Sequence, residues 1–224
     1  MPTDSATTPD ALHEELITRW NAALPHQEQI GEDLLARYAE PHRRYHTADH
    51  LARVLRMIDD LADDHDLFLV RLAAWFHDAV YAIPPGQLPN EEASARLALR
   101  ELSRAGLEQE DLTQVARLVR LTATHLPGSR DPEGELLCDA DLSILAAPAE
   151  EYASYTSAIR TEYAAVPEAV FVAGRLEILT GLIEGDIFRT RKGRALTDAA
   201  RGNLDAERAT LQKRLEELVT GSHP

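Results

Sequence analysis

The chain has 224 residues, and its 38 acidic side chains outnumber its 23 Lys and Arg side chains, which gives a formal net charge of −15. A chain this acidic repels a polyphosphate backbone, so its composition argues against a nucleic-acid-binding protein. It has no run of about 18 apolar residues that would span a membrane. Its single cysteine cannot close an intramolecular disulfide, and we expect a cytoplasmic protein.

Apolar residues recur at three- and four-residue steps along most of the chain, a period typical of amphipathic helices. We predict helices over residues 10–24, 27–40, 48–61, 67–80, 91–105, 108–125, 136–145, 149–164, 168–184 and 197–219. Residues 1–9 are expected to form a flexible tail. No period-two segment predicts a strand, and no Gly/Ser-rich linker divides the chain. The prediction is an all-α fold, with one multi-helix bundle over residues 10–220.

Local signals predict where some of these helices begin. Thr47, Asp66 and Asn90 each precede a helical stretch and are expected to act as N-cap residues. The segment 82–89 contains three prolines and a glycine, so it must be a loop.

Three short segments carry residues typical of a metal site. They supply His50, the consecutive pair His77 and Asp78, and Asp141, each within a stretch predicted as helix. Divalent ions of intermediate softness bind imidazole nitrogen and carboxylate oxygen together. Asp78 and Asp141 lie in apolar runs, where a buried carboxylate is costly unless it is paired or binds a metal. Because a metal turns bound water into a nucleophile at neutral pH, the pattern predicts hydrolysis.

The consecutive pair sets a constraint on this site. Adjacent side chains of a helix point about 100° apart. One of the two can still bind the metal directly while the other bridges to a second ion or to water. The proline loop follows the pair directly and is expected to lie beside the metal.

The spacing of these residues resembles that of the HD-domain metal-dependent phosphohydrolases. The nearest similarity is to a small bacterial group of predicted HD phosphohydrolases. The similar blocks are residues 40–47, 74–81, 90–95, 139–142, 159–163 and 200–204, which span nearly the whole chain. The resemblance implies that a divalent ion, one of Mn, Mg, Fe, Ni, Co or Zn, is bound by His50, His77, Asp78 and Asp141.

A second resemblance suggests roles for two histidines. Residues 45–50, Tyr-His-Thr-Ala-Asp-His, are similar to the Tyr-His-Asn-x-x-His motif of the cyclic-nucleotide phosphodiesterases. That similarity implies that His46 donates a proton to the leaving oxygen and that His50 binds metal, although His46 as a ligand stays open. Residues 140–143 resemble the phosphodiesterase segment that supplies the last ligand, which favours Asp141 over Asp139.

Further candidates have weaker support. His125 ends a predicted helix where some superfamily members place a ligand for a second metal, but a histidine bonded to terminal carbonyls would look the same. Glu91 is a candidate to orient water or a substrate hydroxyl, although a glutamate is favourable at a helix start in any case. Arg43, Arg44 and Arg175 are candidate phosphate ligands, and surface salt bridges explain each of them equally well.

Two departures narrow the expected substrate. In the similar (p)ppGpp hydrolase branch, the His-Asp pair is followed shortly by two acidic residues. In this chain, residues 79–82 after the pair contain no carboxylate. The deoxynucleotidase branch has a glutamate three positions after the pair, where this chain has Tyr81. Both activities are therefore disfavoured.

The sequence thus predicts a metal-dependent phosphohydrolase that acts on a small phosphorylated metabolite, plausibly a nucleotide, through attack by a metal-bound water. Whether the bond is a phosphomonoester, a phosphodiester or a pyrophosphate stays open. One alternative is an HD-type di-iron oxygenase that takes additional ligands from His125 and His46. Another is a non-catalytic metal- and nucleotide-binding module. The amphipathic C-terminal helices fit a homodimer and simple core packing equally well.

Overall fold

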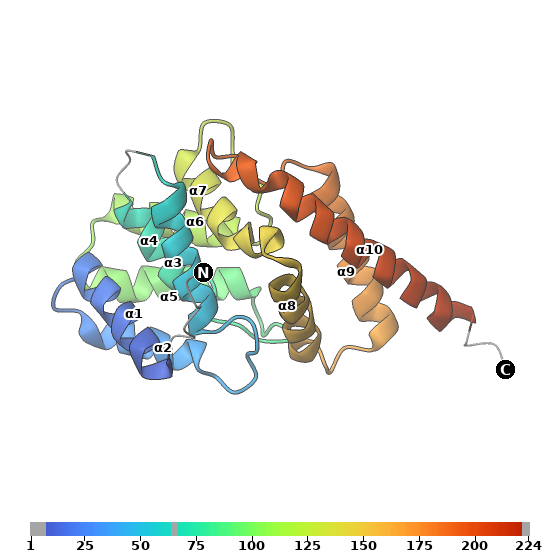
Figure 1. Cartoon of the computed structure of the whole chain (residues 1–224). Coiled ribbons are helices and arrows are strands. Elements are labelled where there is room, and N and C mark those ends of the chain that lie inside the picture. Colours follow the sequence, from blue (N-terminus) through green and yellow to red (C-terminus); the bar gives the residue numbers. More distant parts are fainter. Residues whose placement is uncertain (1–7, 64–66, 221–224) are drawn as a thin grey trace.

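The computed structural model describes residues 8–63 and 67–220. That part of the chain forms ten α-helices and two short 3-10 helices, without a strand, which confirms the all-α prediction (Figure 1). The α-helices are α1 (Pro9–Ala23), α2 (Glu28–Tyr38), α3 (Ala48–Leu61), α4 (Phe68–Phe76), α5 (Asn90–Arg104), α6 (Gln109–Leu121), α7 (Pro132–Asp141), α8 (Ala149–Glu162), α9 (Glu168–Glu184) and α10 (Thr197–Thr220). The 3-10 helices are η1 (Leu142–Ala146) and η2 (Gly193–Leu196).

Two hydrophobic clusters hold the helices together. The larger joins α1 through α7 and contains Trp20, whose ring meets those of Trp75 and Phe76 edge-on, with centroids 5.1 and 6.3 Å away. The smaller joins η1 to α8, α9 and α10. Figure 1 shows α9 and α10 side by side and extending away from the other helices. No helix in the described ranges is long and apolar enough to cross a membrane.

Most predicted helices are present, with shifted ends. The helix α1 begins at Pro9, inside the predicted tail, while residues 1–7 and Asp66 lie outside the described part of the chain. Thr47 is the N-cap residue of α3, but its side chain makes no capping hydrogen bond. Asn90 is the first residue of α5 rather than its cap, and its amide pairs with the N–H and C=O of Ala82. It thereby closes the proline loop.

The helix predicted over 67–80 ends early, at Phe76, and the residues that follow form a turn. Groups from elsewhere in the fold satisfy the turn's backbone. The Ser94 hydroxyl accepts from the N–H of Val80 and donates to its C=O, while Arg43 donates to the carbonyl of Asp78. Because these partners replace the bonds of another helical turn, the chain can leave the helix while buried.

Three helices in mutual contact position the candidate site. They are α3, α4 and α7, and each contributes at least one predicted ligand at or near an end. His50 lies in the first turn of α3, His77 is the C-cap residue of α4, and Asp141 is the last residue of α7. The helix bundle therefore brings together residues that are up to 91 positions apart, from 50 to 141. The prediction of one domain over residues 10–220 stays a prediction.

Candidate metal centre

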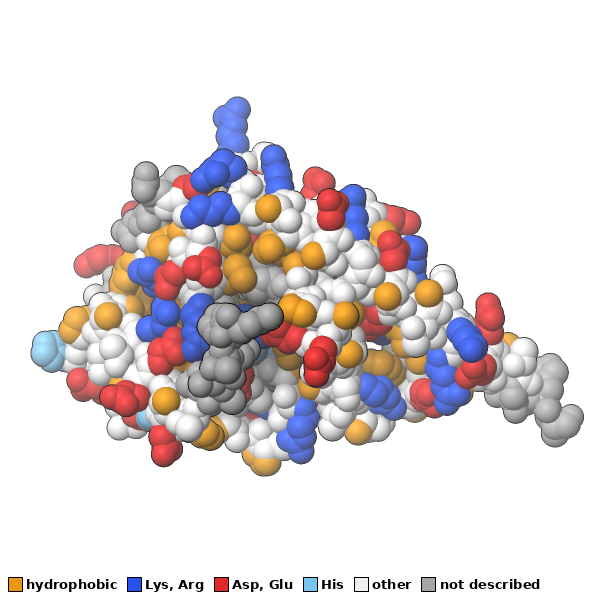
Figure 2. Space-filling view, viewed as in Figure 1, with side chains coloured by type: hydrophobic (Ala, Val, Ile, Leu, Met, Phe, Trp, Pro, Cys, Tyr) orange, Lys and Arg blue, Asp and Glu red, His pale blue; other side chains and the backbone are white. Residues whose placement is uncertain are grey.

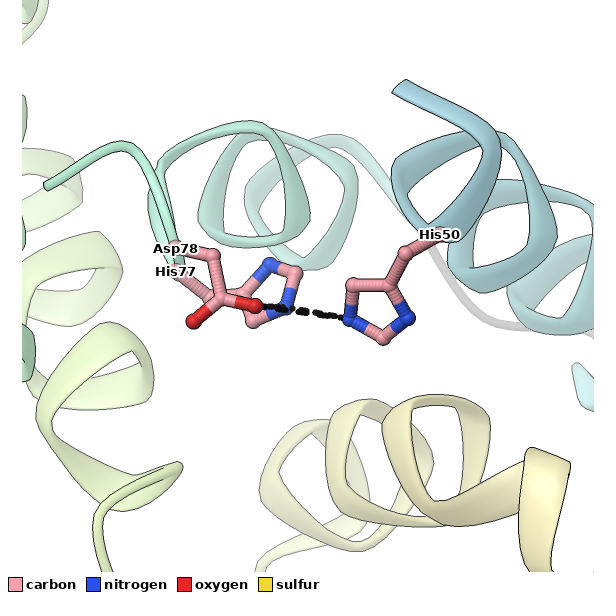
Figure 3. Close-up of side chains that lie close together, drawn as sticks. All are labelled: His50, His77 and Asp78. Atoms are coloured by element: carbon pink, nitrogen blue, oxygen red, sulfur yellow. Dashed lines mark hydrogen bonds and ion pairs between the residues drawn. The ribbon is translucent and has the colours of Figure 1, made fainter. Parts of the chain in front are cut away.

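The side chains of His50, His77 and Asp78 converge in a buried cluster (Figure 3). The Nε2 atom of His50 lies 3.1 Å from Nε2 of His77 and 3.4 Å from Oδ2 of Asp78. The Nε2 atom of His77 lies 3.0 Å from the same Asp78 oxygen. Asp141 completes the group, since its Oδ1 atom lies 3.2 Å from Nε2 of His50 and 3.6 Å from Nε2 of His77.

These separations match the spacing of ligands around one ion. Two donor atoms held about 2.1 Å from a common ion are about 3.0 Å apart in an octahedral site and about 3.4 Å apart in a tetrahedral site. Two imidazole nitrogens and two carboxylate oxygens suit Mn, Fe, Co, Ni or Zn, and carboxylates alone suit Mg. The residues present therefore fit a divalent ion.

The early end of α4 explains how adjacent residues reach the same point. His77 still has helical backbone angles, but Asp78 follows it into the turn and is no longer part of a continuing helix. Their side chains extend toward His50 from one side, as Figure 3 shows. The expectation that the two side chains diverge by a helical step is wrong.

Hydrogen bonding fixes the form of His77. Its Nδ1 atom lies 2.7 Å from the carbonyl oxygen of Ala74, which can only accept, so Nδ1 carries a proton and Nε2 is the nitrogen that faces the cluster. The Nδ1 atom of His50 is buried without a partner among the described residues. Since the two Nε2 atoms face each other, a cation or proton between them is needed to relieve their repulsion.

The charges of the cluster also favour a bound cation. Burial lowers the pKa of His77, but the negative charges of Asp78 and Asp141 outweigh that effect and raise it to about 10. Burial raises the pKa of Asp141, yet the charge of His77 and hydrogen bonds from His125 and His50 bring it far below its ordinary value. The two carboxylates, whose side chains are only 16% and 13% exposed, thus create a strong demand for positive charge, which a divalent ion would meet.

His125 contacts the far side of Asp141. It lies beyond the end of α6, in a left-handed backbone conformation with φ of 52°, rather than at the end of the helix as predicted. Its Nε2 atom is 2.8 Å from Oδ2 of Asp141, so the two oxygens of Asp141 face different histidines. His125 therefore belongs to the site, and its binding of a second ion stays a prediction.

The structure also separates the two candidate aspartates of α7. The carboxylate of Asp139 is completely buried, but it bonds to the backbone of the segment after α9 instead of the histidine cluster. Asp141, which the phosphodiesterase resemblance favours, is the one that lies among the histidines.

His46 is held by a residue that the sequence analysis did not single out as a site residue. Its Nδ1 atom lies 2.7 Å from Oε2 of Glu162, at the end of α8. The other oxygen of Glu162 accepts from three consecutive backbone N–H groups, those of Arg44, Tyr45 and His46, at 2.7, 2.8 and 3.1 Å. The Glu162 side chain is 1% exposed, and it fixes both the loop before α3 and the imidazole.

Tyr81 completes this support. Its ring stacks on that of His46 with centroids 4.1 Å apart, and its hydroxyl donates to Oε2 of Glu162 at 3.2 Å. Burial raises the pKa of Glu162, but its hydrogen bonds with His46 and the backbone lower it to about 2, so the carboxylate is ionised at neutral pH. Glu162 is 116 positions away from His46, and no local signal links them. Its place in the similar block 159–163 was the only hint.

The three candidate arginines and Glu91 lie outside the histidine–aspartate cluster. The guanidinium of Arg43 is fully buried and donates to Glu40 and to three backbone carbonyls, which argues against a role in binding phosphate. Arg175 is paired with Glu207 through two hydrogen bonds and is 9% exposed. Arg44 is exposed and donates to the carbonyls of Pro41 and Arg43. Glu91 lies in the first turn of α5, and the structure shows no contact between it and the cluster within the described ranges.

Comparison with known families matched residues 47–144 to the HD domain. The chain contains an HD domain over residues 47–144, which supports membership of the HD-domain superfamily. HD domains bind divalent metals and are typically metal-dependent hydrolases. The matched segment includes His50, His77, Asp78, His125 and Asp141, whereas α8, α9 and α10 lie beyond it. No curated protein and no solved structure matched the chain.

Proposed function

We propose that this HD-domain protein is a phosphohydrolase that acts on a small phosphorylated metabolite such as a nucleotide. The observation that carries the proposal is the buried cluster of two histidines and two aspartates, with ligand atoms 3.0 to 3.6 Å apart, beside a histidine that a buried carboxylate orients. Superfamily membership supports a metal-dependent hydrolase, and the arrangement around His46 supports a proton-transfer step.

In this proposal His50, His77, Asp78 and Asp141 hold the ion, with Nε2 of His77 aimed by the carbonyl of Ala74. The ion would lower the pKa of a bound water and neutralise charge on the phosphoryl oxygens. The two buried histidines and the contacts among all four ligands limit their freedom, which is what a preorganised site requires.

His46 donates a proton to the leaving oxygen from its Nε2 atom. Glu162 accepts the Nδ1–H of His46, which leaves Nε2 as the atom available to the substrate. Tyr81 holds the imidazole plane from one face. We propose His46 as the general acid and Glu162 as its positioning residue.

The contact between His125 and Asp141 gives the oxygenase alternative its one specific support. A carboxylate whose two oxygens face different histidines is able to bridge two ions. Metal content decides between the two functions: two irons per chain with an oxygen-sensitive absorption spectrum would favour the oxygenase.

The test is the release of phosphate and pyrophosphate from a panel of nucleotides and sugar phosphates, with Mn²⁺ and with a chelator. Asp141→Asn removes a proposed ligand, and Asp205→Asn, at an exposed position of α10, is the matched control. We expect release that requires Mn²⁺, is abolished by Asp141→Asn and is unchanged by Asp205→Asn. Release that survives both the chelator and Asp141→Asn would contradict the proposal.

A further inference from the structure

The segment between α9 and α10 carries the densest run of positive charge in this acidic chain. Four of the six residues from 189 to 194 are Arg or Lys. Figure 2 shows basic side chains gathered at the upper edge of the molecule, in the region where Figure 1 places the start of α10 beside α7. This concentration contrasts with a net charge of −15 for the whole protein.

The segment is anchored to α7 by Asp139. One Asp139 carboxylate accepts from the backbone N–H groups of Arg189 and Thr190, at 2.9 and 2.8 Å, and from the Thr190 hydroxyl at 2.7 Å. Gly193 packs so closely that an added Cβ atom would lie 2.2 Å from the same carboxylate. Because Asp139 is two residues before Asp141, the anchor holds the segment beside the metal centre.

Three of the four basic side chains contact two different parts of the protein. Arg191 pairs with Asp63 at 2.6 Å, and Lys192 donates to the carbonyls of Asp60 and Ala62, so both fasten the segment to the end of α3. Arg189 contacts the other side, where one nitrogen donates to the carbonyl oxygen of His125 at 3.2 Å. That histidine in turn contacts Asp141.

The guanidinium of Arg189 has unused binding capacity. Of its five N–H donors, the structure shows one in use, and no carboxylate among the described residues forms a salt bridge with it, although its charge acts to lower the pKa of Asp139. Arg43 and Arg175, in contrast, are committed to protein acceptors. Arg189 is therefore a half-buried arginine that is linked to the cluster through His125 and has donors available to bind an anion.

We propose that Arg189 binds the phosphate group of the substrate at the edge of the metal centre. This inference rests on the proposed function and adds a residue that holds the substrate. A phosphate next to two aspartates needs nearby positive charge, and the planar fork of arginine bonds two phosphate oxygens at once. The anchor at Asp139 means that the arginine is already in place before the substrate arrives, which limits the entropy lost on binding.

Arg189→Gln tests the proposal, because an amide can still donate to the His125 carbonyl while the charge is lost. The probe is inorganic phosphate, titrated calorimetrically into the Mn²⁺-loaded full-length protein. We expect phosphate binding to weaken about tenfold or more in Arg189→Gln, with partial recovery in Arg189→Lys and with Mn²⁺ content and Tm unchanged. Arg191→Gln, in the same segment but paired at the end of α3, is the matched control and should bind phosphate as the wild type does.

The proposal is overturned if the wild type fails to bind phosphate, if Arg189→Gln binds it equally well, or if Arg191→Gln weakens binding as much. Because the titration does not depend on turnover, it separates the two proposals. Phosphate binding that depends on Arg189 in a protein that hydrolyses nothing would uphold the anion site and contradict the phosphohydrolase. Hydrolysis together with phosphate binding that does not depend on Arg189 would support the phosphohydrolase and contradict the anion site.

Discussion

Replacing Glu162 by Gln removes a negative charge next to His46 while keeping the length of the side chain. In the wild type, the carboxylate accepts the Nδ1–H of His46 at 2.7 Å and is nearly inaccessible to solvent. In Glu162→Gln, the single amide oxygen still accepts from the three backbone N–H groups. The NH₂ group takes the place of the second carboxylate oxygen, and it can only donate to Nδ1. The imidazole then loses the charged acceptor that holds its Nδ1–H.

The size of the effect follows from the lost hydrogen bond. A hydrogen bond to a charged group contributes about 1.5 to 3 kcal/mol. If proton donation limits turnover, that loss corresponds to a fall in kcat of about 10- to 150-fold. KM and Mn²⁺ content should stay near the wild-type values, because Glu162 contacts none of the proposed ligands in the described structure.

The assay compares two substrates of the same class that differ in leaving group. The p-nitrophenolate released from a p-nitrophenyl ester needs no proton. The kcat for that substrate should therefore fall much less in Glu162→Gln than the kcat for an alkyl ester. Manganese content and Tm are measured in parallel. An equal loss for both leaving groups, or a loss of manganese, would refute the role of Glu162 in positioning the general acid.

Three further predictions concern the ligands, the anchor and pH. His50→Ala should lose most bound Mn²⁺ on dialysis, as measured by mass spectrometry, and full retention would contradict the assignment. Gly193→Ala should lower stability by about 1 to 3 kcal/mol because its Cβ would clash with Asp139. Gly202→Ala, with open space around it in α10, should leave stability equal or higher. Glu162 has a pKa lowered from 4.5 to about 2, so it stabilises the fold above pH 4.5 and loses that contribution as pH falls toward 2. Acid denaturation curves should therefore show a smaller loss of stability over that pH range in Glu162→Gln than in the wild type. Parallel curves would contradict this stabilising role of Glu162.

Periodicity and spacing predicted much of this protein. The three- and four-residue recurrence of apolar side chains predicted the helices, because each helix must bury one face. The cost of burying a carboxylate in an apolar run correctly singled out Asp78 and Asp141 as residues that need positively charged partners. An HD domain was likewise predicted from the motif residues, and the match over residues 47–144 confirms it. The cytoplasmic location and the homodimer stay predictions.

Other features depend on groups that are distant in the sequence. The turn after Phe76 forms because Arg43 and Ser94 satisfy its backbone, and this turn lets His77 and Asp78 face the same point. His46 takes its orientation from Glu162, which comes from a helix outside the matched HD segment.

The sequence by itself determined which residue types could form a metal centre and which segments would be helical, because both depend on local pattern and burial. Only the tertiary structure decided which charged residues remain available to a substrate. Arg43 and Arg189 are alike in type, but one is fully bonded within the core and the other is held beside His125 with most of its donors unused. That difference arises from hydrogen bonds between distant segments, which no local pattern specifies.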